Sequence, residues 1–195
     1  MTVDLEPAAR QLADLIAQVP DDLLGGPTPC PAYTLGDLVD HVSGLALAFT
    51  AAARKAPVPG APDRASGDAS RLGDDWRRRL GQELDALAEA WREPAAWTGE
   101  TRAGGIDLPG EVAGLVTLDE LVVHGWDVAR ASGQPYTCDA DLLEVVHGFL
   151  DAWVRPDEES AREGIFGPAI PVPDDAPLLD RVVGLTGRDP AWSPG

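Results

Sequence analysis

Two side chains that can ligate a metal stand one helical turn apart in the stretch TLDELVVHGWDVARASG, residues 117–133. Glu120 and His124 are four positions apart, and four residues advance an α-helix by about 400°, so the two side chains project about 40° apart on one face. A carboxylate and an imidazole in this arrangement can bind one divalent ion together. The pair alone is weak support, because 33 of the 195 residues are acidic and such spacings arise by chance.

A third ligand has to come from elsewhere in the chain. His41, in the stretch DLVDHVSGL, stands at the margin of an apolar stripe, where a side chain can point into a crevice between helices. Asp127 follows His124 by three residues and is a candidate to orient a ligand or a water molecule of the site. The alternative for Asp127 is an ordinary surface pair with Arg130. Periodicity alone leaves open whether the polar strip of Glu120, His124 and Asp127 faces water.

Two other chemistries are possible for the histidines of this chain. Glu144 precedes His147 by three residues, the Glu-x-x-His spacing of di-iron bundles. Glu144 falls opposite the predicted apolar face of its helix and no second Glu-x-x-His exists, which argues against a dinuclear site. A hydrolytic triad of Ser43, His124 and Asp127 would place two of its members on one helix strip. The sequence also lacks a glycine-rich phosphate loop and a GxSxG elbow.

Charge and composition exclude several classes of partner. The formal net charge is −18 and the isoelectric point is near 4.3, so nucleic acid and anionic membranes are not expected to bind. The N-terminal stretch MTVDLEPAAR does not resemble a signal peptide, and no stretch approaches the ~18 apolar residues of a membrane span. A cytoplasmic location is therefore expected. Cys30 and Cys138 lie far apart without a CxxC motif, which predicts reduced thiols.

Helical periodicity predicts the elements that must position these residues. Five helices are predicted over Leu5–Leu24, from the N-cap Thr34 to Lys55, Asp68–Arg92, Glu111–Ala131 and Asp139–Val154, and a short one over Pro177–Leu185. The glycine-rich stretch 95–110 predicts an irregular crossover or a short extended segment. The pattern predicts an all-α fold: one domain over residues 1–195, an antiparallel four-helix bundle with a long crossover and a short C-terminal appendage.

Three segments carry a resemblance to a known family: PTPCPAYTLGDLVDHVSGL, DELVVHGWDVARASGQ and FGPAIPVPDDAPLLDRVVGLTGR. They make nearly the whole chain similar to the DinB-like superfamily of metal-binding proteins, specifically the group that resembles the N-terminal domain of mycothiol-dependent maleylpyruvate isomerase. The resemblance implies a bundle fold and a triad for zinc or another divalent ion such as nickel, which maps onto His41, Glu120 and His124. It also implies mycothiol as a cofactor, whose thiolate adds reversibly to the double bond of the substrate.

Two functional interpretations follow. Two imidazoles and one carboxylate leave a coordination position free, as in catalytic sites, whereas structural zinc sites are closed. This favours a metal-dependent transferase or isomerase that uses a low-molecular-weight thiol on a small molecule. The rival is a non-catalytic bundle in which the ion is structural or serves ligand binding and regulation. The resemblance implies a further C-terminal domain in the isomerase, while about 40 residues remain here, which argues against maleylpyruvate itself. A homodimer is left open.

Overall fold

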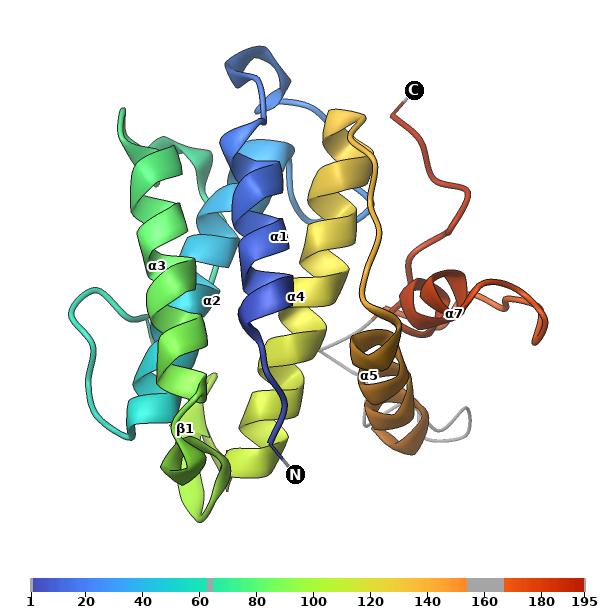
Figure 1. Cartoon of the computed structure of the whole chain (residues 1–195). Coiled ribbons are helices and arrows are strands. Elements are labelled where there is room, and N and C mark those ends of the chain that lie inside the picture. The colour runs from blue at the N-terminus through green and yellow to red at the C-terminus, as the bar shows by residue number, and fades with distance from the viewer. Residues whose placement is uncertain (1, 63–64, 154–166, 195) are drawn as a thin grey trace.

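Four helices pack side by side as a bundle (Figure 1): α1 (Glu6–Ala17), α2 (Leu35–Arg54), α3 (Trp76–Trp91) and α4 (Gly110–Ser132). The computed structural model describes residues 2–62, 65–153 and 167–194. Around the bundle, α1 contacts α3, α3 contacts α2, α2 contacts α4, and α4 contacts α1. Helices α1 and α4 run in the opposite direction to α2 and α3 (Figure 1). The prediction of an all-α four-helix bundle is confirmed; the neighbours α1 and α3, and α2 and α4, are antiparallel, whereas α1 and α4, and α2 and α3, are parallel.

The start of α2 is set by a reciprocal capping interaction. The Thr34 side chain accepts the Asp37 backbone N–H at 3.2 Å, and the Asp37 carboxylate accepts the Thr34 backbone N–H at 3.1 Å. The other oxygen of Asp37 accepts the backbone N–H of Ala69, which fastens the long connection between α2 and α3 onto the same turn. This capping box places His41 about two turns into α2.

The bundle core is made of aliphatic side chains that recur at helical spacing. Leu12, Leu38, Leu84 and Leu118 come from the four different helices, and each is at most 1% exposed. Burying a side chain of this size stabilises the fold by about 1.5–3 kcal/mol. The core therefore holds α2 and α4, which carry the three predicted ligands, at a fixed separation.

The glycine-rich stretch between α3 and α4 adopts the extended alternative of the prediction. After the 3-10 helix η3 (Pro94–Trp97), strands β1 (Glu100–Ala103) and β2 (Ile106–Pro109) pair as an antiparallel hairpin. Gly104 and Gly105 form its turn with φ of +60° and +83°, a region that favours glycine. The Thr101 hydroxyl donates to the carbonyl of Ala52 at 2.6 Å, so the hairpin is fastened to the end of α2.

Two helices are shorter than predicted. Helix α1 ends at Ala17 rather than Leu24, because Pro20 disfavours helical backbone at the residue before it and itself adopts an extended conformation. Residues Asp21–Leu23 form the separate 3-10 helix η1. Helix α3 begins at Trp76 rather than Asp68.

The delayed start of α3 also has a local cause. Asp68 caps the 3-10 helix η2 (Ala69–Arg71), since its carboxylate accepts the backbone N–H of Ser70. Gly73 then takes a φ of +68°, which interrupts the helical path. The helical signal of residues 68–92 therefore arises from two elements rather than one.

The C-terminal appendage lies against α4 (Figure 1). Helices α5 (Ala140–Trp153) and α7 (Leu178–Leu185) pack on each other, and α5 contacts α4. The predicted end of the fifth helix, Val154, lies outside the described residues. After α7 the chain returns to α4, where the Arg130 side chain donates to the carbonyl of Trp192 at 3.1 Å. None of the described helices has the length and apolar composition that a membrane crossing requires.

Candidate metal centre

The three predicted ligands come together between α2 and α4. One nitrogen or oxygen atom from each of His41, Glu120 and His124 lies within 4.8 Å of the corresponding atoms of the other two. The imidazole rings of His41 and His124 are perpendicular, with centroids 5.1 Å apart. Within residues 2–62, 65–153 and 167–194, no other group of three His, Cys, Asp or Glu side chains has this geometry. The tertiary structure thus joins a residue of α2 to a pair 79 and 83 positions later.

The polar strip of α4 faces the interior of the protein. His124 is 5% exposed and Asp127 is fully buried, while the side chain of Glu120 keeps 26% of its surface accessible. Helix α4 is enclosed because α1, α2 and α5 all pack against it, and the Tyr136 ring covers Gly125 so closely that a Cβ atom there would lie 3.0 Å away. The alternative that this strip faces water is wrong.

His124 is held from both sides by carboxylates. Its Nδ1 lies 3.0 Å from Oδ2 of Asp127, and its Nε2 lies 2.9 Å from Oε2 of Glu120. Burial lowers the pKa of His124, but the hydrogen bonds with Asp127 and Glu120 outweigh it and raise the pKa to about 9. The metal-free protein therefore carries an imidazolium whose Nε2 proton sits between His124 and Glu120, where a divalent ion would be bound.

His41 is in the opposite state. Burial and the neighbouring His124 lower the pKa of His41 to about 4, so its imidazole is neutral at pH 7. Its Nδ1 is buried without a hydrogen-bond partner among the described residues, and the Tyr33 ring packs at 4.9 Å between centroids. A buried polar atom without a partner costs free energy, and neutral imidazole is the form that ligates metals. The residues present therefore fit a divalent ion.

Comparison with known proteins assigns the family. Residues 5–129 match the model of the mycothiol maleylpyruvate isomerase N-terminal domain, a stretch that includes all three candidate ligands. The chain belongs to this family.

Full-length relatives and solved structures support the family assignment. Uncharacterized proteins from two strains of Mycobacterium tuberculosis are each 31% identical over 184 residues, which cover 93% of this chain and of theirs. Crystal structures of the mycothiol-dependent maleylpyruvate isomerase and of a point mutant superpose with a TM-score of 0.56 at 18% and 20% identity. The alignments cover 75% of this chain and 65% of those chains, so this chain spans less than two thirds of the isomerase. This likeness confirms the fold.

One charged residue that contacts the site lies outside residues 5–129, the stretch that matches the family domain. Arg188, after α7, places Nη2 3.0 Å from Oδ2 of Asp127 and Nε 3.4 Å from Oδ1. Burial opposes the charge of Asp127, but Arg188 and His124 together lower the pKa of this carboxyl. The alternative pair of Asp127 with Arg130 is wrong, because Arg130 donates instead to the carbonyls of Pro190 and Trp192. No spacing rule links Asp127 to a residue 61 positions away.

Asp119 is a second ionisable neighbour of the site, and the sequence analysis did not single it out. It is 2% exposed, and its Oδ1 has no hydrogen-bond partner among the described residues. Burial, aided by the negative charge of adjacent Glu120, raises the pKa of Asp119 to about 8. Its only sequence signal is its position next to Glu120. A carboxyl that stays protonated at neutral pH adds no charge to the metal-free site.

The competing site residues lie elsewhere. His147 Nε2 is 3.0 Å from the Arg181 guanidinium of α7, and Glu144 is exposed, so neither joins the triad. The Ser43 hydroxyl donates to Glu83 at 2.6 Å. Among the described residues, His41, Glu120 and His124 are thus the one group of three possible metal ligands.

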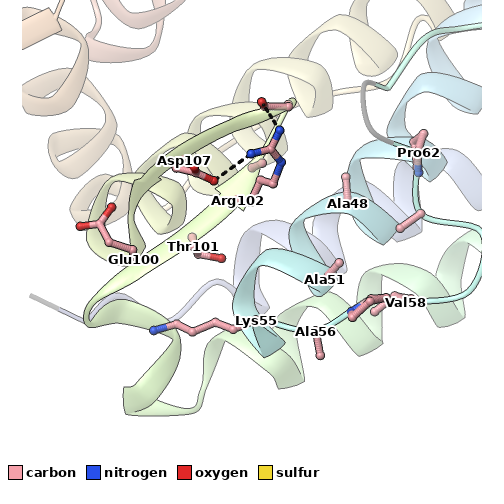
Figure 2. A pocket seen from close by; sticks show the side chains of 15 residues that line it. Ala48, Ala51, Lys55, Ala56, Val58, Pro62, Glu100, Thr101, Arg102 and Asp107 are labelled. Atoms are coloured by element: carbon pink, nitrogen blue, oxygen red, sulfur yellow. Dashed lines mark hydrogen bonds and ion pairs between the residues drawn. The ribbon is translucent and has the colours of Figure 1, made fainter.

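The two larger cavities are not lined by His41, Glu120 or His124. One of about 530 Å³ lies between the end of α2, the following loop and the β1–β2 hairpin (Figure 2). Its two cations are already engaged, Arg102 with Asp107 and Lys55 with the Thr98 carbonyl. Glu120 also lines a narrow apolar crevice among α1–α4, together with Phe49.

Metal binding should displace the proton of His124. At pH 7 we expect the protein to release about one proton for each divalent ion that it binds, because His124 is charged and His41 is neutral at that pH. Since the pKa of His124 is raised to about 9, affinity should rise with pH and level off above that value. The slope should be about tenfold per pH unit at intermediate pH. Calorimetric zinc titrations in buffers of different ionisation enthalpy measure the proton count; a count near zero at pH 7 would contradict this charge assignment.

Proposed function

We propose that the chain binds one divalent ion through His41, Glu120 and His124, with zinc as the first expected metal and nickel as an alternative. The observation that carries this proposal is the convergence of three ligand atoms within 4.8 Å on two rigid helices. The orphaned Nδ1 of His41 and the paired nitrogens of His124 support it, since both are explained when an ion occupies the space between them. Imidazole and carboxylate ligands suit zinc and nickel.

An open coordination position favours an enzyme over a structural site. The described residues add no fourth His, Cys, Asp or Glu to the group, and three protein ligands with a free position are typical of catalytic zinc. When bound, the ion would supply a positive charge that favours the deprotonated form of a thiol at neutral pH.

The side chains around the ligands have separate roles in this proposal. Asp127 orients the imidazole of His124 through Nδ1, which directs Nε2 toward the ion. Tyr33 packs its ring against that of His41 and so limits the movement of this imidazole. The Glu120 side chain is 26% accessible and that of His124 is 6%, so a small substrate would approach from the side of Glu120 rather than that of His124.

The family supports a mycothiol-type thiol as one reactant. We infer that the protein is a metal-dependent thiol transferase or isomerase that acts on a small electrophile. In an isomerisation, the thiolate electron pair forms a bond to one carbon of the double bond while the π pair moves to the conjugated carbonyl oxygen. The remaining single bond rotates, the π pair returns to re-form the double bond, and the sulfur leaves with the C–S pair as a thiolate. The thiol is regenerated, so no further reactant is consumed. Because this chain spans 65% of the isomerase structures, the substrate is proposed only as a class: alkenes conjugated to a carbonyl.

One observation favours a second candidate function. The crevice beside Glu120 is narrow and has little room for a substrate, as expected if the ion stabilises the bundle or serves ligand binding and regulation. In that case the centre would bind metal without turning over a substrate.

A turnover assay separates the two functions. Zinc-loaded protein is incubated with mycothiol and a set of cis-alkenes conjugated to carbonyls, maleylpyruvate included, and proton NMR follows isomerisation and conjugation. The enzyme proposal expects turnover that needs both metal and mycothiol and is lost in Glu120→Gln. His147→Gln is the matched control and should retain it. Metal binding without any thiol-dependent turnover across the set would favour the non-catalytic function.

A further inference from the structure

Arg188 belongs to the C-terminal segment of the chain, and its side chain extends into the interior of the protein. Its side chain is 11% exposed and contacts Asp127, which is fully buried, in a fork geometry: Nη2 to Oδ2 at 3.0 Å and Nε to Oδ1 at 3.4 Å. The remaining terminal nitrogen, Nη1, donates to the carbonyl of Thr186 at 3.0 Å. The guanidinium is therefore held on two sides, and it in turn holds the carboxylate.

Two side chains contact the carboxylate of Asp127. Its Oδ2 lies 3.0 Å from Nδ1 of His124 and 3.0 Å from Nη2 of Arg188. A guanidinium is always charged, whereas an imidazole is charged only when it is protonated, so Arg188 is the permanent cation at this carboxylate. A buried carboxylate without a charged partner is costly. Arg188 therefore holds Asp127 in place as a buried, charged group.

We propose that Arg188 is a positioning residue of the metal centre. It fixes the Asp127 carboxylate so that Oδ2 accepts the Nδ1–H of His124 and Nε2 remains directed toward the ion. The inference rests on the proposed metal site and extends it: a group from outside residues 5–129, the stretch that matches the family domain, tunes the affinity of the site. Groups that orient metal-ligating histidines alter metal affinity by about 10–100-fold when they are removed.

A second arginine provides the matched control. Arg130 also ties the C-terminal segment to α4, through hydrogen bonds from Nε to the Trp192 carbonyl at 3.1 Å and from Nη2 to the Pro190 carbonyl at 3.4 Å. Its guanidinium stacks over Trp126 rather than on Asp127 or a candidate ligand. Removing Arg130 weakens the docking of the segment and leaves the Asp127 contact in place. Comparison of the two arginines therefore separates positioning from docking.

The test uses the full chain with Arg188→Gln, Arg188→Lys and Arg130→Gln. Zinc affinity is measured by competition with a chromophoric chelator, and the ligand geometry by the visible absorption of the cobalt-loaded protein. Arg188→Gln should weaken zinc binding about 10–100-fold and shift the cobalt bands, whereas Arg130→Gln should stay within about twofold of the parent. Arg188→Lys should regain part of the affinity, because it keeps the charge without the fork. If Arg188→Gln does not fold, Arg188→Lys carries the test, with a smaller loss and shifted cobalt bands expected.

A double variant tests whether Arg188 acts on zinc affinity through Asp127. If Arg188 acts through Asp127, adding Arg188→Gln to Asp127→Asn should cause little further loss of zinc affinity. Unchanged zinc affinity and cobalt bands in Arg188→Gln would overturn the inference while leaving the metal site intact. An equal loss in Arg130→Gln would also overturn it, in favour of docking. A parent protein that binds no metal would instead refute the proposed function.

Discussion

Replacement of His124 by alanine should abolish tight binding of the divalent ion. The loss of one of three protein ligands leaves His41 and Glu120 on different helices, and we expect affinity to fall by at least about a thousandfold, roughly 4 kcal/mol. His41→Ala and Glu120→Gln should have comparable effects. The parent protein should retain about one zinc ion per chain through mild dialysis, because the described residues offer one cluster of three ligands. Elemental analysis of the four proteins gives the stoichiometries.

The third histidine supplies the control for this series. His147 faces Arg181 rather than the triad, so His147→Ala should keep the full metal content of the parent. Glu120→Gln is the most informative variant, since it preserves the volume of the side chain and removes only the ligating charge. Equal metal content in the parent and in all three ligand variants would show that the ion, if any, binds elsewhere.

A small thiol should lose its proton at this centre near neutral pH. A free thiol has a pKa of about 8.5, and a neighbouring divalent cation lowers it by roughly two units or more. In cobalt-loaded protein a coordinated sulfur gives charge-transfer absorption in the near ultraviolet. We expect this absorption to appear when mycothiol is added, and to be absent in Glu120→Ala. A stronger response to mycothiol than to a simple thiol would indicate that the chain recognises the rest of that molecule.

The two cysteines of the protein are replaced by serine in this experiment, so that they cannot contribute to the absorption. Burial raises the pKa of Cys30, and burial together with Asp139 raises that of Cys138 to about 11, so both stay protonated at neutral pH. The Cys30→Ser, Cys138→Ser protein nevertheless removes any contribution from them. If no thiol enters the cobalt shell, and the metal-free protein loses its fold, the ion is structural and the enzyme proposal fails.

Local sequence was sufficient for most of the secondary structure and for one half of the site. Apolar residues at helical spacing located the four bundle helices, and Gly133, with a φ of +70°, ends α4 close to the predicted position. The spacing of Glu120 and His124 placed them on one face of that helix. The errors at α1 and α3 occurred where Pro20 and Gly73 turn the chain while apolar residues continue at a helical period. Periodicity reports which face is apolar, but it does not report where the backbone leaves the helix.

Only the tertiary structure decided the rest of the site. The direction of the Glu120, His124 and Asp127 strip depends on what packs around α4, and a largely apolar helix gives no local preference for one orientation over another. The meeting of His41 with α4 and of Arg188 with Asp127 joins residues separated by about 60 to 80 positions. Contacts of this kind arise because burial of the apolar faces brings distant segments together. Buried charged groups then form ion pairs with the oppositely charged groups that lie nearby. That pairing is a property of the packed chain, so no local pattern in the sequence encodes it.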